Sequence, residues 1–159
     1  MTTIDDLVGA WTFVSAEEVF ANGARRPQFG PEAAGYLSYS PDGIVTAVLG
    51  STSRPASSSP DPQSASDADV VAMARGFIAY GGAFTLDPET DTVTHHIDIA
   101  LFPGWQGGDQ VRHFTVDGDL LHGRTLPMVS PDGRSLHVEL TWERVHPRTS
   151  PSINRKASS

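Results

Sequence analysis

Apolar and polar residues alternate along this chain in short runs that are separated by turns. The tetrapeptide Ser-Pro-Asp-Gly occurs twice, at Ser40–Gly43 and Ser130–Gly133; its proline favours a tight turn, and its glycine supplies a positive φ. The runs between turns are rich in Val, Ile, Thr, Phe and Tyr, which is typical of strands. They predict eight strands, at Ala10–Val19, Gly35–Tyr39, Ile44–Leu49, Tyr80–Leu86, Thr92–Phe102, Gln110–Val116, Asp119–Leu126 and Ser135–Arg144.

One segment has the periodicity of a helix. Ser66 is a suitable N-cap, and the apolar residues after it recur on one face of a helix predicted over Asp67–Ala79. That stripe consists of Val70, Val71, Ala74, Phe77 and Ile78. The Ser/Pro-rich segment 51–64 and the tail 147–159 lack such a pattern, and we expect a mobile loop and a disordered tail. The folded domain is therefore predicted to span residues 1–146.

Eight antiparallel strands joined in sequence order close well into a small up-and-down barrel with room for one ligand. In such a barrel the first strand begins and the last strand ends at the same rim, so Trp11 and Arg144 should lie at the same end of the barrel. The short turns fall at this rim as well, and the long connections fall at the opposite one. We therefore expect an all-β, eight-stranded barrel with a closed floor, a loop-rich mouth and one inserted helix near the mouth.

Composition and charge argue against several classes of function. The formal net charge is −8 at pH 7 with no basic stripe to offset it, so we expect no binding to nucleic acid or to a membrane. The chain has no cysteine, and its single lysine, Lys156, lies in the tail, which argues against thiolate or Schiff-base chemistry inside the fold. The start of the chain does not resemble a signal peptide, which favours a cytoplasmic location. No nucleotide-binding motif is present, and we expect no cofactor.

Several segments carry a resemblance to a known family. Gly9 and Trp11 are similar to the Gly-x-Trp motif that opens the first strand of lipocalins, and Arg144 is similar to the basic residue that packs over that tryptophan. Further similar segments lie at 35–43, 75–82, 94–98, 101–105 and 109–112. In this order they resemble the microbial lipocalin-like domain family of calycin-type small β-barrels, over residues 7–144. The resemblance implies a lipocalin-like barrel and leaves open whether it is a carrier or an isomerase or cyclase.

The strand predicted at Thr92–Phe102 contains two adjacent histidines whose side chains must point to opposite faces. His95 shares its face with Val93, Ile97, Ile99 and Leu101, so this apolar face should line the interior. A buried imidazole has a lowered pKa, which makes His95 a candidate general base or simply a hydrogen-bonded core residue.

The opposite orientation of this strand is the alternative. It would place His96 and Asp98 inside the barrel, as a base and the carboxylate that orients it.

The hairpin after Gln110 contains two more histidines. A two-residue turn at Asp117-Gly118 would pair His113 with His122 and Phe114 with Leu121. The face of Phe114 and Leu121 is the more apolar and should point inward, which leaves the two histidines outside. They lack a third ligand at a useful spacing, so no metal site is predicted.

Arg112 lies on the inward face of the same hairpin and would be a charge inside the barrel. It could pair with an internal carboxylate or bind an oxyanion, enolate or carboxylate of a ligand, and we take it with His95 as the candidate catalytic pair. Inward-facing and mouth residues are candidates for ligand contact. These are Tyr39, Tyr80, Ile97, Trp105, Gln110 and Phe114.

Three functions remain compatible with these observations. The first is a barrel that binds one small, largely apolar organic molecule, as a carrier or sequestering protein. The second is a cofactor-free isomerase or cyclase acting on a polyketide-like or other secondary-metabolite substrate, with His95 moving a proton and Arg112 stabilising negative charge. The third is a protein-interaction module that uses the mouth loops. The expected partner is a small hydrophobic ligand or substrate, and we allow for a homodimer.

Overall fold

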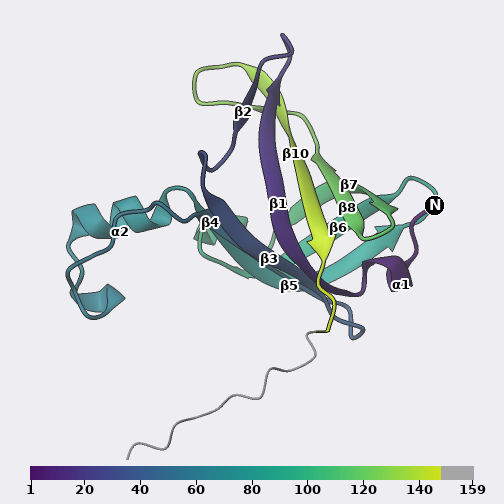
Figure 1. Cartoon of the computed structure of the whole chain (residues 1–159), viewed down its shortest axis with the longest axis horizontal. Coiled ribbons are helices and arrows are strands. Elements are labelled where there is room, and N and C mark those ends of the chain that lie inside the picture. The colour runs from purple at the N-terminus through teal and green to yellow at the C-terminus, as the bar shows by residue number, and fades with distance from the viewer. Residues whose placement is uncertain (148–159) are drawn as a thin grey trace, which may run out of the picture.

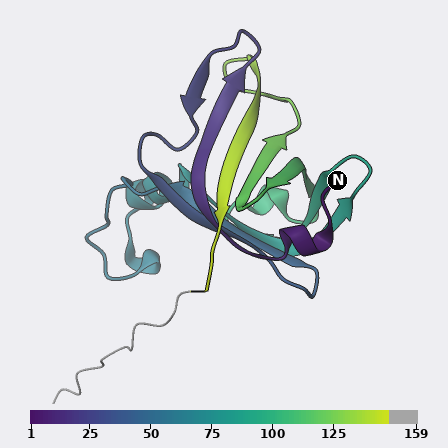
Figure 2. The same ribbon diagram turned by 45° about the vertical axis from the view of Figure 1, so that its right-hand side comes forward.

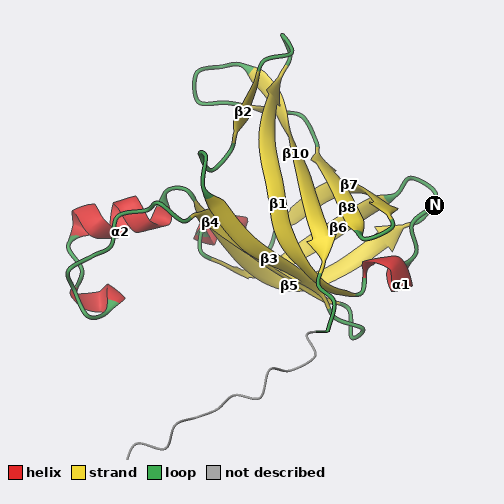
Figure 3. Cartoon of the chain, in the orientation of Figure 1, coloured by secondary structure: helices red, strands yellow, loops and turns green. Residues whose placement is uncertain are grey.

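One antiparallel sheet closes on itself in the computed structural model, which describes residues 1–147 (Figure 1). Helices are few and short, as the colouring of Figure 3 makes clear. The strands are β1 (Gly9–Phe20), β2 (Arg25–Pro27), β3 (Ala33–Tyr39), β4 (Ile44–Ser51), β5 (Phe77–Asp87), β6 (Thr92–Ala100), β7 (Asp109–Asp117), β8 (Leu120–Thr125), β9 (Met128–Val129) and β10 (Ser135–Arg144). The helices are α1 (Ile4–Leu7) and α2 (Asp67–Ala74), with 3-10 turns η1 (Pro62–Ser64) and η2 (Pro103–Trp105). The tail predicted to be disordered lies, from residue 148 onward, outside the described residues.

The predicted up-and-down barrel is confirmed. Each of the eight long strands is hydrogen-bonded to the next in the chain, and β1 pairs with β10 to close the circle. The strands β2 and β9, which the sequence patterns did not predict, extend the sheet beside β1 and β10 at the mouth (Figure 2). Both predicted Ser-Pro-Asp-Gly turns form, since Gly43 and Gly133 have positive φ and donate to the carbonyls of Ser40 and Ser130.

The floor of the barrel is built around Trp11, which is fully buried. Trp11 pairs with Arg144 across β1 and β10, and the guanidinium lies 4.1 Å from the centroid of the indole ring. The same guanidinium donates to the carbonyl oxygens of Asp6 at 2.6 Å and Val8 at 3.1 Å. Arg144 therefore ties the beginning of the chain to the last strand, at the shared rim that parity predicted and with the packing over Trp11 that the lipocalin resemblance implied.

The predicted helix ends earlier than expected. The Ser66 hydroxyl accepts from the backbone N–H of Asp69, so the predicted N-cap is confirmed, but the helix stops at Ala74 because Gly76 takes a φ of +75°. Phe77 and Ile78 open β5 instead, and without them the predicted apolar stripe is not buried. In Figures 1 and 2, α2 stands away from the barrel wall beside the mouth. Among the described residues, no helix is long and apolar enough to cross a membrane.

The predicted inward face of the Thr92–Phe102 strand is wrong beyond Ile97. A bulge leaves Asp98 without a partner between the pairs Gly82↔Ile97 and Gly81↔Ile99, and Ile99 is 69% exposed on the outer face. The two strands approach closely here, because a methyl group on Gly82 would lie 1.8 Å from the carbonyl oxygen of His96. The bulge shifts the alternation by one residue, which simple periodicity does not anticipate.

The predicted register of the β7–β8 hairpin is wrong by two residues. The loop residues are Gly118-Asp119 rather than Asp117-Gly118, with the positive φ at the first position, as in a type II′ turn. His113 therefore faces Arg124, and His122 faces Thr115. A shift of two residues keeps each side chain on its predicted face, so both histidines are outside as expected.

We predict that Arg144→Lys lowers the free energy of unfolding by about 1–3 kcal/mol, because lysine cannot stack flat on Trp11 and bond both carbonyls. Urea unfolding measures the change, with Arg124→Lys on the exposed face of β8 as the matched control. The control should change stability by less than about 0.5 kcal/mol. Equal midpoints for the two variants would show that the floor contacts contribute nothing.

Candidate functional site

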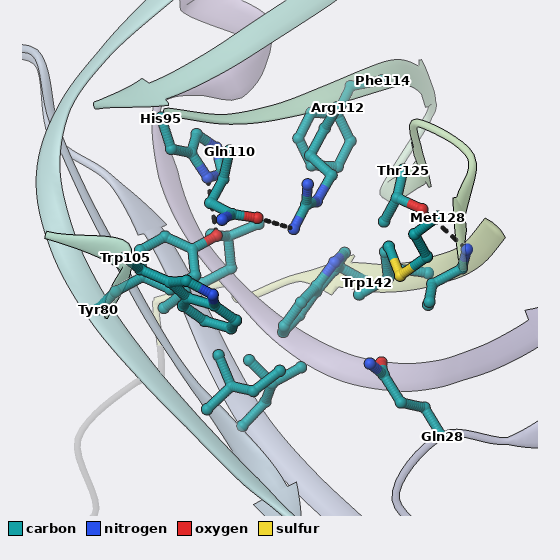
Figure 4. Close-up of a pocket in the computed structure, with 16 residues that line it drawn as sticks. Gln28, Tyr80, His95, Trp105, Gln110, Arg112, Phe114, Thr125, Met128 and Trp142 are labelled. Carbon is teal, nitrogen blue, oxygen red and sulfur yellow. Dashed lines mark hydrogen bonds between the residues drawn. The ribbon is translucent and has the colours of Figure 1, made fainter. Parts of the chain in front are cut away.

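The inward-facing side chains leave a cavity of about 150 Å³ inside the barrel (Figure 4). Its apolar wall comes from five strands, through Leu37, Ala47, Leu49, Ile78, Phe114, Val138 and Leu140. Its polar, aromatic and sulfur-containing groups are Gln28, Tyr80, His95, Trp105, Gln110, Arg112, Thr125, Met128 and Trp142. The inserted helix lies beside the mouth as predicted, but no residue of α2 lines the cavity, whereas Trp105 does.

His95 lies in the cavity wall and is held between two tyrosines. Its side chain is 1% exposed, its Nε2 lies 2.7 Å from the Tyr39 hydroxyl, and its Nδ1 lies 2.8 Å from the Tyr80 hydroxyl. Both ring nitrogens therefore have a partner within the protein. The three side chains come from β3, β5 and β6, so the contact fixes the relative position of three strands.

The burial of Tyr39 determines the tautomer of His95. Tyr39 is 1% exposed, and in the described part of the chain its hydroxyl has no other hydrogen-bond partner than Nε2. Its single hydrogen must then be donated to Nε2, because an unpaired buried hydroxyl is costly. We therefore assign the imidazole proton to Nδ1, which donates to the oxygen of Tyr80. The hydrogen of the Tyr80 hydroxyl is left available to the cavity.

This cluster is uncharged at neutral pH. Burial lowers the pKa of His95 from 6.5 to about 3, with a further contribution from the positive charge of Arg112. Burial also raises the pKa of Tyr39 and of Tyr80 above the usual 10. Arg112 acts on all three groups, which places its charge close to them.

Arg112 is positioned by its own strand, β7. Its guanidinium donates to the Gln110 side-chain oxygen at 3.1 Å and to the Val111 carbonyl at 2.8 Å. Among residues 1–147 no carboxylate lies within salt-bridge distance of it. Of the two roles considered from the sequence, pairing with an internal carboxylate is thus not observed.

Two tryptophans complete the cavity. Trp105 in η2 packs edge-on against Tyr80, with ring centroids 6.2 Å apart, and lies at the mouth as predicted. Trp142 in β10 is 2% exposed, and its indole N–H has no hydrogen-bond partner in the described structure. Nothing in the sequence marked Trp142 as a binding residue, although alternation along β10 with Val138 and Leu140 would have placed it inside.

The structure brings together most of the predicted site residues. His95, Arg112, Tyr80, Trp105, Gln110 and Phe114 all line the cavity. Tyr39 and Ile97 are buried but do not line the cavity, and Tyr39 lies behind His95 and Phe114, which do. Gln28 and Met128, which also line it, come from mouth connections that no periodic pattern covers.

The alternative pair His96 and Asp98 lies on the outer face of β6, contrary to the orientation that would make it a site. His96 Nδ1 is 2.8 Å from the Asp109 carboxylate, and its side chain is 40% exposed. The pair is outside because Val93, His95 and Ile97 occupy the buried positions of β6, which leaves His96 and Asp98 on the outer face.

The family comparison agrees with this architecture. A family model described as a lipocalin-like domain matches residues 8–145. The chain is 27% identical over 88 residues to the 4'-hydroxy-3'-methoxypropiophenone carrier protein ppsC of Aspergillus oryzae, which covers 52% of this chain and 79% of that protein. It is also similar to the siderocalin Ex-FABP, at 11% identity over 92% of this chain and 78% of that one, with a TM-score of 0.28.

We predict that the free energy of unfolding decreases as the pH is lowered, because His95 is neutral in the fold. Between its unfolded pKa of 6.5 and the folded value of about 3, only the unfolded chain binds the proton, so acid favours unfolding. Between pH 7 and pH 5, the free energy of unfolding should decrease by about 2 kcal/mol less in His95→Gln than in the unmodified protein. Urea unfolding at the two pH values measures it, and His96→Gln on the outer face is the control. If His95→Gln and His96→Gln show the same pH dependence of the unfolding free energy, a neutral, buried His95 is contradicted.

Proposed function

Because the chain belongs to the lipocalin-like domain family, we propose that it binds one small, largely apolar organic molecule in its barrel and serves as a carrier. The observation that carries this proposal is the cavity, whose wall is apolar and whose polar groups converge from β5, β6, β7 and β10. A mostly apolar cavity with a few placed polar groups is the usual form of a small-molecule site.

The size of the cavity limits the ligand. An apolar cavity of about 150 Å³ engineered into another protein holds benzene, and the cavity here has about the same volume. We therefore expect a molecule built on one ring. The Aspergillus relative supports this expectation, because the compound in its name is a one-ring phenolic ketone.

The isomerase or cyclase hypothesis has weaker support. A general base near neutral pH needs a free nitrogen and a pKa near the working pH. His95 has both nitrogens bonded to tyrosines and a pKa of about 3, so it is poorly suited to take a proton from a substrate. The interaction-module hypothesis does not account for an open cavity inside the barrel. The carrier is therefore the function that the geometry favours.

We predict that Ile78→Trp abolishes or weakens ligand binding by filling the cavity. Ile78 lines the cavity and is partly buried, whereas Ile99 points outward from β6 and is 69% exposed. Isothermal titration with propiophenone, a neutral one-ring ketone, should show affinity falling about tenfold or more for Ile78→Trp. The matched control Ile99→Trp should bind like the unmodified protein.

The control also separates binding inside the barrel from binding at its surface. If the Ile99→Trp protein loses binding and the Ile78→Trp protein keeps it, the ligand sits on the outer wall and the proposal is wrong. If the unmodified protein binds no one-ring molecule, the carrier function itself is refuted.

A further inference from the structure

Four of the polar groups in the cavity wall have hydrogen-bond donors that the described part of the chain does not use. Arg112 has more N–H groups than its two bonds to Gln110 and Val111 use, and a guanidinium has no acceptor. The Gln110 oxygen is occupied by Arg112, so its amide N–H groups are what it can offer to a ligand. The Tyr80 hydroxyl has accepted from His95 and has its hydrogen to donate. We call Tyr80, Gln110, Arg112 and Trp142 the donor group.

Trp142 makes the excess of donors most evident. Its indole N–H is a donor only, is buried in the wall of the cavity, and has no partner in residues 1–147. A buried unpaired donor lowers stability, and native folds seldom contain one without a reason. Figure 4 shows the Arg112 guanidinium, the Tyr80 hydroxyl and the Trp142 indole around the open part of the cavity, with Gln28 apart from them.

The acceptors nearby are already in use. The Thr125 hydroxyl donates to the Leu126 carbonyl and accepts from the Val138 N–H. The Tyr80 oxygen accepts from His95, and Tyr39 lies behind His95, outside the cavity lining. A ligand beside these groups therefore meets more free donors than free acceptors.

The charge of the cavity wall is positive. His95 and Tyr80 are the other ionisable groups that line the cavity, and with Tyr39 behind them they are neutral at pH 7. Arg112 is therefore the single charge in the cavity wall, and no carboxylate of the described chain neutralises it. A partly buried guanidinium without a counter-ion is unfavourable until an anion binds.

We propose that the ligand is a one-ring organic acid bound as its anion, with a phenolate, enolate or carboxylate oxygen held by Arg112, Tyr80 and Trp142. This inference rests on the carrier function proposed above and adds the chemical class of the ligand. An anionic oxygen accepts several hydrogen bonds at once and compensates the charge of Arg112, whereas a neutral carbonyl does only the first. The ring of the ligand then lies against the apolar wall.

A matched pair of probes tests the anion directly. 4-Nitrophenol is yellow only as the phenolate, so its absorbance reports its ionisation state when bound, and 4-nitroanisole is the same ring with the acidic hydrogen replaced by methyl. The unmodified protein should bind nitrophenolate about tenfold or more tightly than nitroanisole. The bound nitrophenol should ionise about one pH unit or more below the free compound, because Arg112 stabilises the anion.

Substitution of Arg112 should remove this preference and leave the cavity intact. In Arg112→Leu the affinity for nitrophenolate should fall about tenfold or more, and the shift in its ionisation should disappear. Nitroanisole should bind this variant as well as or better than the unmodified protein, which also shows that the variant is folded. Arg124→Leu, on the exposed face of the adjacent strand β8, should leave both probes unaffected.

Trp142→Phe distinguishes a binding role from a structural one. Phenylalanine keeps most of the packing against Phe13 and removes the unpaired N–H. We expect the ligand-free variant to be at least as stable as the unmodified protein, and its affinity for nitrophenolate to fall about threefold or more. A residue needed for packing alone would lower stability and leave the preference between the two probes unchanged.

The outcomes separate the two proposals. If nitroanisole binds in a manner sensitive to Ile78→Trp but nitrophenol binds only as the neutral phenol, the carrier function stands and the anion inference is overturned. Equal loss of both probes in Arg112→Leu would also overturn it, because the arginine would then act on the cavity and not on the charge. If neither probe enters the unmodified protein, the cavity is not a ligand site and both proposals fail.

Discussion

The pairing of β1 with β10 is the constraint on which the rest of the structure depends. By closing the sheet it removes both long edges and divides every strand into an inner and an outer face. Trp11 and Arg144 hold that closure at the floor, where the chain begins and the last strand ends. Once the floor is filled, the inner side chains nearer the mouth do not fill the barrel completely, and the space that remains is the cavity.

The interior polar groups fall into two sets, one that is satisfied within the protein and one that is not. His95, Tyr39 and Tyr80 satisfy one another through two hydrogen bonds and stay neutral, so they are stable inside the barrel without a ligand. Arg112 and Trp142 do not satisfy one another, since both are donors. The first set joins strands β3, β5 and β6. The second set has free hydrogen-bond donors that an acceptor on a bound ligand would satisfy. A fold built for stability alone would have placed apolar side chains at both positions.

Alternation predicted the inward faces of His95 and Arg112, which depend only on the two-residue period of a strand. The alternating direction of eight strands predicted the barrel end that Trp11 and Arg144 share, and the family resemblance implied that Arg144 packs over Trp11. What they missed depends on tertiary contacts. The bulge at Asp98 arises where Gly82 allows two backbones to approach, and it reverses the faces beyond Ile97. The hydrogen-bond partners of a buried group, as in the tyrosines around His95 or the unpaired indole of Trp142, depend on side chains from distant strands that no local pattern relates.

The most direct test of the account is a crystal structure of the protein with 4-nitrophenol, grown at a pH where the probe is ionised. We expect the ring inside the barrel against the apolar wall, with the phenolate oxygen within hydrogen-bond distance of the Arg112 guanidinium and the Trp142 indole nitrogen. A probe bound on the outer face of the barrel, or seated in the cavity with its phenolate oxygen directed away from Arg112, would contradict it.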